Sequence, residues 1–365
     1  MQAPHGLGFA IDQRETDLCI IRERPVEEAY LRDLQQQALL WKRNRGLKKN
    51  QTVTFDVAWH NILGFATQER AETLVDLLND ALVDSGIRFE LVSFDYVWRS
   101  EWFQLDLWTA EEMDMKETLR VGTSTTLNVY SCVPSYQGTR VAGSSAFPDD
   151  YGDDPVRDGI VLDVAFSPVG GEGGATFIHE VGHWLGLRHT FGPSCATDND
   201  LVDDTETHLK PDLSNPPPAG TCPTSQFCPL GRTGPVENFM NYGFAGCQTL
   251  FTAGQIGRTE DQVAMYRPAP LTAAEMNGPE VLHAGRPAVW SVDVETGYGP
   301  YTYSWHVAQG FGITPIGSNA REITDTVRCT LRDCERYEEL VTIACTITDS
   351  EGQQITVEHQ VLVWN

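Results

Sequence analysis

The chain has 365 residues, of which 41% are hydrophobic and 21% are charged, which indicates a globular protein with room for two domains. Its formal net charge of −25 argues against binding to nucleic acid or to an anionic membrane surface, because both carry negative charge themselves. No apolar run is long enough to span a bilayer, so no membrane insertion is expected.

Residues 1–50 are polar and charged, and we interpret them as a pro-segment rather than as part of a core. Within them, Glu27–Trp41 carries apolar residues at helical spacing and a basic patch follows at Lys42–Arg45. The first eight residues lack the basic start and the apolar stretch of a signal peptide. We therefore expect a secreted protein whose signal has been removed or lies outside this chain.

Residues 51–268 alternate between strand and helix patterns, which predicts an α/β (α+β) domain. Helical spacing of apolar residues covers 69–83, and further helices are expected just after the glycine-rich turn at 170–174 and over 254–266. Short apolar or alternating runs predict the strands, the fourth of them as an edge strand: Val53–Val57, Phe89–Val92, Thr126–Tyr130, Val141–Phe147 and Ile160–Val164.

A proline-rich linker is predicted at residues 269–274, and a second domain at residues 275–365. Short alternating runs separated by turns predict a small all-β, immunoglobulin-like sandwich there. We expect Trp305 to be a core residue of that sandwich rather than part of a ligand site.

The helix after the glycine-rich turn carries the chemistry. His179 and His183 are four residues apart, so both imidazoles can reach one ion from one helix face, with Glu180 beside them. Gly186 can end the helix in a left-handed conformation and let His189 return as a third ligand. Three neutral histidines leave one zinc position open for water, as in catalytic sites. Zinc would lower the pKa of that water, and Glu180 would act as general base and then as acid.

The alternative for the two-histidine core alone is a helix that happens to carry histidines. The full His-Glu-x-x-His-x-x-Gly-x-x-His string, however, arises by chance in a chain of this length less than about once in ten thousand. Downstream, Met240 can form an apolar floor beneath the histidines, and the Tyr242 hydroxyl can reach the metal or stabilise an oxyanion.

This string resembles the metzincin clan of zinc endopeptidases, and the wider match is to its pappalysin family. The likeness runs from near Thr52 to near Arg267. It implies a catalytic domain with a mixed twisted sheet and an active-site helix, acting on protein or peptide substrates. The segments that carry it are Leu127–Cys132, His179–Phe191, Leu201–Thr205, Asn238–Tyr242, Cys247 and Phe251–Gln255.

The chain also departs from the family pattern. The family's methionine turn often reads Asn-Tyr-Met-Asp-Tyr, whereas Phe239 and Asn241 stand here, and neither change removes a metal ligand. Members that cleave before Arg or Lys have Asp at the position of Ala245. We therefore expect a neutral or apolar preference at the residue after the scissile bond.

Nine cysteines favour disulfides and an oxidising compartment, and the odd total leaves at least one thiol unpaired or paired between chains. Four of the cysteines form a first cluster: Cys195, Cys222, Cys228 and Cys247. Spacing alone allows three pairings of them, and the resemblance implies two crossed bonds, Cys195 with Cys228 and Cys222 with Cys247. The pairing of the second cluster stays open: Cys329, Cys334 and Cys345.

Acidic residues gather just after the metal helix, where Asp198, Asp200 and Asp204 are candidate ligands of a structural calcium ion, together with Asp203. A solvated acidic loop is the alternative. Pappalysins carry calcium near this region, so the resemblance favours Ca²⁺.

Cys19 is a candidate zymogen switch, because a pro-segment thiolate can bind the zinc in place of water. Pappalysin pro-segments contain such a cysteine, although Ile20 and Ile21 replace the usual Gly-Thr after it. The alternative is an incidental buried thiol, and Cys132 is a second candidate for the unpaired cysteine.

The C-terminal domain resembles the polycystic-kidney-disease type of immunoglobulin-like sandwich, through Pro300–Trp305 and Ile347–Gly352. Such modules aid attachment to substrates or surfaces, and a bare spacer is the alternative. The sequence therefore predicts a secreted zinc endopeptidase. The competing functions are a catalytically silent binding protein that retains the fold and an adhesin dominated by the sandwich.

Overall fold

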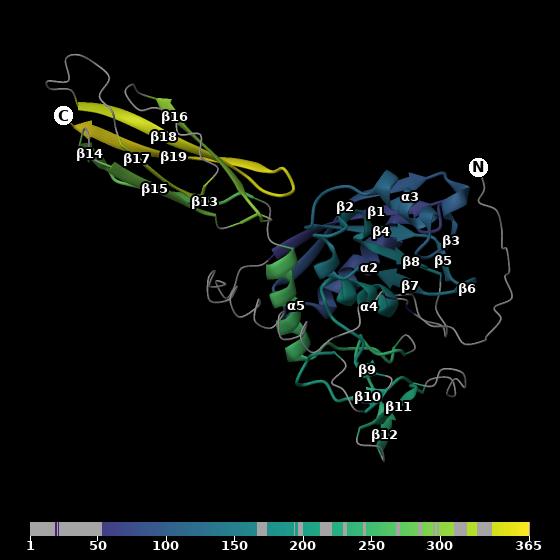
Figure 1. Cartoon of the computed structure of the whole chain (residues 1–365). Helices are drawn as coiled ribbons and strands as arrows, with labels where there is room; N and C mark the ends of the chain where they lie inside the picture. Colours follow the sequence, from purple (N-terminus) through teal and green to yellow (C-terminus); the bar gives the residue numbers. More distant parts are fainter. Residues whose placement is uncertain are drawn as a thin grey trace. The chain divides into compact units, whose positions relative to one another are not determined.

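The computed structural model places the chain in two compact units, which divide between Tyr266 and Arg267 (Figure 1). None of the helices it describes is both long and apolar enough to cross a bilayer. The residues described are 19, 21, 53–165, 174–192, 194–195, 200–211, 221–228, 232–243, 246–267, 271–283, 287–294, 296–297, 299–309, 320–326 and 338–364.

A five-stranded mixed sheet organises the first unit, in the order β2-β1-β4-β8-β7. The first four strands are parallel, and β7 pairs antiparallel with β8 at the edge. The predicted α/β class is confirmed, and so is an edge strand within residues 141–147. The strands are β1 (Val53–Ile62), β2 (Ile87–Val97), β4 (Thr126–Ser131), β7 (Gly143–Ser145) and β8 (Ile160–Leu162).

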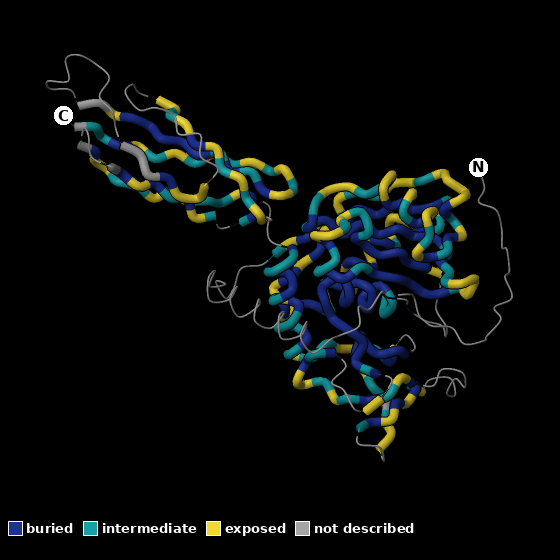
Figure 2. Tube along the Cα trace, in the orientation of Figure 1, coloured by how far each residue is buried: buried dark blue, intermediate teal, exposed yellow. Residues whose placement is uncertain are grey.

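Two helices, α2 (Gln68–Ala81) and α4 (Gly174–Trp184), pack against one face of this sheet and share its core. Figure 2 shows the central strands and α4 as buried. Phe55 of β1 meets the Trp184 ring edge-on at 5.3 Å between centroids. Each aromatic ring buries a large apolar surface, and the edge-to-face geometry adds to that stabilisation. The packing fixes α4 against the sheet, next to the edge strand β7.

The opposite face of the sheet carries a second, smaller core beneath α3 (Ala110–Leu119). Within α3, Glu112 and Lys116 form a buried ion pair at 2.9 Å, one helical turn apart. The elements on this face are η1 (Ser100–Trp102), β3 (Gln104–Asp106), β5 (Val133–Tyr136) and β6 (Thr139–Arg140), and the short helices η2 (Pro148–Asp150) and η3 (Pro155–Arg157) follow β7.

The chain after α4 forms a small four-stranded sheet in the order β12-β11-β10-β9 and then the helix α5 (Ala253–Tyr266). Two disulfides link its loops, Cys195–Cys228 and Cys222–Cys247, as the crossed pairing requires. Disulfides of this kind stabilise a region that has few apolar residues to bury. The strands are β9 (Phe191–Gly192), β10 (His208–Leu209), β11 (Thr224–Phe227) and β12 (Arg232–Pro235).

The second unit is all-β, with a three-stranded sheet (β13-β15-β17) and a four-stranded sheet (β14-β19-β18-β16) that enclose one core. Trp305 is buried in that core, as predicted, and Trp290 joins it from the other sheet. The strands are β13 (Ala274–Asn277), β14 (Val281–His283), β15 (Pro287–Val294), β16 (Thr302–Gln309), β17 (Glu322–Thr326), β18 (Glu338–Thr348) and β19 (Gln354–Trp364).

Candidate metal centre

Three histidine side chains converge on one point at the end of α4. The Nε2 atoms of His179 and His183 are 3.1 Å apart, and each lies 3.2 Å from Nε2 of His189. A tetrahedral ion with Zn–N bonds of about 2.0–2.1 Å separates its nitrogen ligands by about 3.3 Å. The spacing of the three nitrogens therefore fits a zinc ion.

Backbone carbonyls select the tautomer of two of these rings. His179 Nδ1 donates to the carbonyl of Phe239 at 2.7 Å, and His183 Nδ1 donates to that of Leu187 at 2.8 Å. With the proton on Nδ1, each Nε2 presents a lone pair to the shared point. Since a second lone pair cannot satisfy the first, the arrangement calls for a cation.

Burial keeps the three rings neutral. Desolvation lowers the pKa of His179 to about 4, against the opposing hydrogen bond to Phe239. It also holds the pKa values of His183 and His189 well below the usual range, and the neighbouring imidazoles act in the same direction. Neutral imidazole is the form that binds a metal, so these three side chains are ready to ligate at neutral pH.

Two glycines shape the helix around the site. Gly186 has φ 91°, the left-handed conformation predicted for it, and the Leu187 N–H reaches back to the carbonyl of Gly182 at 2.9 Å. This turn returns the chain so that His189 faces α4. Gly182 instead permits a close approach, because a Cβ there would collide with Sδ of Met240.

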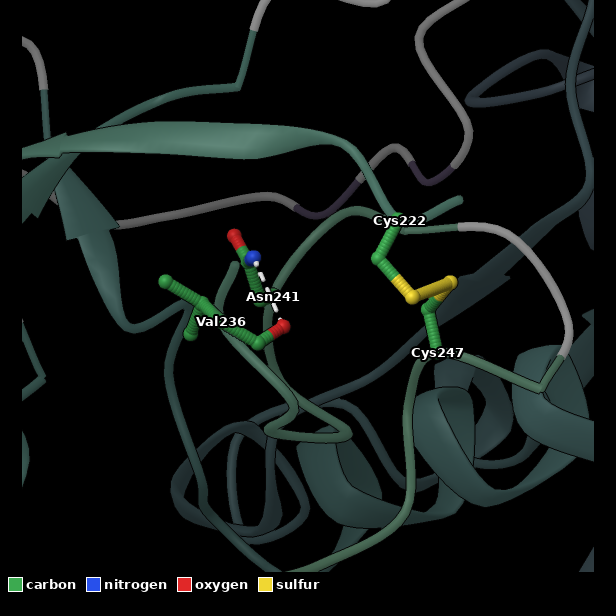
Figure 3. Close-up of a disulfide and its surroundings, with 4 residues drawn as sticks. All are labelled: Cys222, Val236, Asn241 and Cys247. Carbon is green, nitrogen blue, oxygen red and sulfur yellow. Dashed lines mark hydrogen bonds between the residues drawn. A yellow bond between two sulfur atoms is a disulfide. The ribbon is translucent and has the colours of Figure 1, made fainter. Parts of the chain in front are cut away.

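The turn that carries Met240 lies beneath the histidines. Met240 is fully buried, and its N–H donates to Asn238 Oδ1 at 2.9 Å. The Asn241 amide donates to the carbonyl of Val236 at 3.3 Å, close to the Cys222–Cys247 disulfide (Figure 3). The crosslink and these hydrogen bonds hold the turn in place under α4.

Tyr242 and Lys210 border the site on this side. The Tyr242 ring lies 5.0 Å from the His189 ring between centroids. The Lys210 ammonium lies 5.0 Å from the centroid of the Tyr242 ring, a cation–π contact. Its positive charge also contributes to lowering the pKa of His189.

Glu180 is fully buried beside the three nitrogens. Burial raises its pKa to about 8, and a hydrogen bond from the Cys19 thiol, 3.4 Å from Oε2, opposes that rise. Its Oε1 atom has no hydrogen-bond partner among the described residues. A divalent cation nearby would favour the ionised carboxylate.

Cys19 lies within the site although it precedes Glu180 by 161 residues along the chain. Its Sγ and one nitrogen from each of His179, His183 and His189 all lie within 4.8 Å of one another. The carbonyl of Cys19 accepts a hydrogen bond from the Tyr242 hydroxyl at 2.7 Å. Its backbone forms a parallel bridge with Gly143 of the edge strand.

Gly143 and Phe147, which sequence reasoning did not single out, also shape the site. A Cβ on Gly143 would lie 2.7–2.9 Å from the Glu180 side chain, so the edge strand approaches the carboxylate only because this residue is glycine. The Phe147 ring meets the His183 ring edge-on at 5.5 Å. A glycine inside a predicted strand was the available signal for Gly143.

Of the three predicted calcium ligands, the structure describes Asp200 and Asp204, and each accepts hydrogen bonds from its own surroundings. Asp200 Oδ1 accepts from the Val202 N–H and the Thr205 hydroxyl. The Asp204 carboxylate accepts from the Thr252 hydroxyl at 2.6 Å and the Gly254 N–H at 2.8 Å, at the start of α5. Asp198 lies outside the described residues, as does Ala245. Calcium binding stays a prediction from the sequence.

Residues 125–264 match the sequence model of a peptidase family described as pregnancy-associated plasma protein-A. An extracellular metalloprotease of Colletotrichum graminicola is 34% identical over 235 residues, which cover 59% of this chain and 78% of that protein. An extracellular metalloprotease of Pyricularia oryzae is 31% identical over 219 residues, which cover 56% of this chain and 70% of that protein. The structure of myroilysin matches at 14% sequence identity with a TM-score of 0.28, and the match covers 61% of this chain and 96% of the myroilysin chain. At this TM-score we base no conclusion on the structural match and rely on the sequence relatives.

The close approach of α4 to Met240 predicts the cost of a methyl group at Gly182. Gly182→Ala should destabilise the fold by about 1–3 kcal/mol, because Met240 is fully buried and must shift to make room. Gly257→Ala in α5 is the matched control, since a Cβ there meets nothing within 4 Å. Replacing a flexible helical glycine by alanine should stabilise the fold by about 0.5–1 kcal/mol. Denaturant unfolding of both variants measures the difference. Equal stability of the two would contradict the packing described.

Proposed function

This chain is an extracellular metalloprotease that belongs to the pappalysin (pregnancy-associated plasma protein-A) family, and we propose that it is a metzincin zinc endopeptidase. The observation that carries the proposal is the convergence of three Nε2 atoms at 3.1–3.2 Å. His179, His183 and His189 would hold the zinc. When bound, zinc would polarise the scissile carbonyl and lower the pKa of a water molecule.

The remaining steps fall to the chain's own side chains. Glu180, buried beside the histidines, takes a proton from the attacking water and passes it to the leaving amine. Tyr242 donates its hydroxyl to the carbonyl oxygen as negative charge develops there. In this structure the same hydroxyl donates to a peptide carbonyl, that of Cys19, at 2.7 Å. Met240 supports the histidines from below.

The edge strand β7 orients the substrate. One side of β7 pairs with β8, and on its other side the described residues form only the single bridge to Cys19. An extended peptide can add to such an edge through main-chain hydrogen bonds, whatever its sequence. Because Gly143 lies against Glu180, a peptide paired there presents its backbone to the general base.

We propose that Cys19 keeps the full-length chain latent. Its thiol lies among the ligand atoms, its carbonyl occupies the Tyr242 hydroxyl, and its backbone occupies the edge strand. A thiolate ligand would take the zinc position that the water needs. The pro-segment therefore uses the groups that a substrate must use.

Removing the general base is the first test. Glu180→Gln should lower the rate of casein hydrolysis by about 10²–10⁴-fold, because the amide cannot accept the proton, while the zinc content stays at one per chain. Glu90→Gln, an exposed change on β2, is the control and should leave the rate unaltered. If Glu180→Gln cleaved casein as fast as the control, the mechanism would be wrong and a non-catalytic binding role would gain ground.

The latency proposal is tested by comparing activity before and after limited proteolysis of the N-terminal segment. In the uncleaved chain, Cys19→Ala should raise activity by about tenfold or more, equivalent to about 1.4 kcal/mol or more of capping free energy. Cys345→Ala, a buried cysteine of the second unit, is the matched control and should behave as wild type. A Cys19→Ala chain that remained as inactive as wild type before proteolysis would exclude the switch.

We also propose that the second unit is a polycystic-kidney-disease-type, immunoglobulin-like sandwich that attaches the protease to a surface or substrate. Supporting this, its two sheets enclose a core that includes Trp290 and Trp305, and Val289 and Leu340 expose about half of their surface. Leu271 already belongs to that core, so a truncation must begin there rather than at residue 275.

Removal of residues 271–365 should leave casein hydrolysis within about twofold, because the zinc site and its core lie wholly in the first unit. The same truncation should reduce retention on insoluble protein such as collagen or keratin, measured by co-sedimentation. The Glu180→Gln full chain serves as a control that binds without cleaving. Unchanged retention after truncation would favour the simple spacer.

A further inference from the structure

A pocket of about 60 Å³ opens beside the edge strand, between β7 and the start of α3. Its walls include the side chains of Trp108 and Met113 on the α3 side, and Ser144 and Phe147 on the strand side. A single water molecule needs about 10–15 Å³ of such space. The space therefore accommodates several waters or one side chain.

One ring separates this pocket from the metal centre. Phe147 lines the pocket and also meets the His183 ring at 5.5 Å. Gly143, the residue against Glu180, is followed directly by Ser144 and Ser145, which both border the pocket, and the lining continues to Phe147. At about 3.3 Å per residue, Ser144 and Ser145 lie about 3–7 Å along the strand from Gly143. A peptide paired with β7 thus places the side chain of a residue about two positions from the scissile bond at the mouth of the pocket.

Trp108 is held at this mouth in an unusual conformation. Its φ is 66°, which is rare for a bulky residue, and the residue is 38% exposed. The backbone N–H donates to Glu112 Oε2 at 2.6 Å, and the ring packs on Tyr136 at 4.7 Å. Glu112 is itself fixed by Lys116 in the buried ion pair. Such conformations persist where surrounding contacts enforce them, and they concentrate at binding sites.

Each charged group that lines the pocket already has a partner. Lys116 contacts Glu112 and also donates to the carbonyl of Arg157 at 2.8 Å. The Arg157 guanidinium pairs with Asp154 at 2.6 Å, and Asp150 has interactions of its own. A charged ligand would lose its hydration without gaining an unsatisfied counter-charge. An apolar ligand gains contact with an indole, a thioether and a phenyl ring.

We propose that this pocket is a specificity subsite that receives an apolar side chain of the substrate, of the size of Leu, Met or Phe, about two residues from the scissile bond. The inference rests on the proposed endopeptidase function and adds a determinant of its sequence preference. Trp108 and Met113 contact the substrate side chain, and the Glu112–Lys116 ion pair holds Trp108 in position.

The test is cleavage-site profiling of a peptide library with the proteolytically activated enzyme and its variants. Wild type should enrich Leu, Met or Phe at one position about two residues from the cleaved bond. Trp108→Ala should reduce the kcat/KM ratio of apolar over Gly-containing peptides at that position by about tenfold, the size of effect that one apolar contact supports. Trp98→Ala, a 74% exposed tryptophan after the strand at the opposite edge of the sheet, should leave the profile as in wild type.

A second variant guards against a simple loss of folding. Ala146→Leu adds bulk to the pocket from the strand side without removing any contact, and should shift the preference at the same position towards Ala and Gly. Zinc content and the thermal unfolding midpoint are measured for each variant. Profiles of Trp108→Ala and Ala146→Leu that match that of Trp98→Ala would overturn the subsite while leaving the proposed protease intact. Absence of any cleavage by activated wild type would instead overturn the proposed function.

Discussion

Three neutral imidazoles held with their lone pairs facing one another form an arrangement that only a cation relieves, and the rest of the first unit is built to maintain it. The carbonyls of Phe239 and Leu187 fix the protons on the far side of two rings. Burial removes the option of protonation, since charging any ring would cost desolvation as well as repulsion. The three rings are therefore already placed as metal ligands, and their placement depends on the turn at Gly186 and the turn at Met240.

Close approach, rather than special side-chain chemistry, explains three glycines around this centre. Gly143 lets the edge strand reach Glu180, Gly182 lets the methionine turn rise beneath α4, and Gly186 lets the chain reverse. At each of them a Cβ would meet an atom of another element. Because all three contacts converge on one short helix, strand, turn and helix cannot be adjusted independently. The three histidines are thus a small part of what specifies the site.

The sequence was sufficient for what depends on local spacing and not for what depends on distant packing. The i, i+4 histidines and the glycine three residues on predict a metal helix, a turn and a third ligand, and the short apolar and alternating runs predict the strands of an α/β domain. The position of Cys19 was different, because its neighbouring residues match the expected pattern only in part. What places its thiol near Glu180 is the pairing of its backbone with Gly143 and the hydrogen bond from Tyr242, contacts that no local periodicity encodes. The pocket at Trp108 was missed for the same reason, since its walls come from separate segments joined only by the fold.

The proposed latency, substrate orientation and side-chain preference all depend on one strand edge, that of β7. A segment that pairs with β7 satisfies its main-chain groups without regard to sequence, so pairing alone cannot distinguish a pro-segment from a substrate. Discrimination must come from side chains along the strand. At Gly143 the Cys19 thiol lies 3.4 Å from Glu180 and close to the three histidines, and in the proposed switch it competes with water for the open metal position. Farther along, Phe147 separates that position from the pocket beside Trp108. In the proposed function, inhibition and selection thus act at neighbouring places on the same edge: the pro-segment caps the metal through one residue, while another residue sets the preference for substrate side chains.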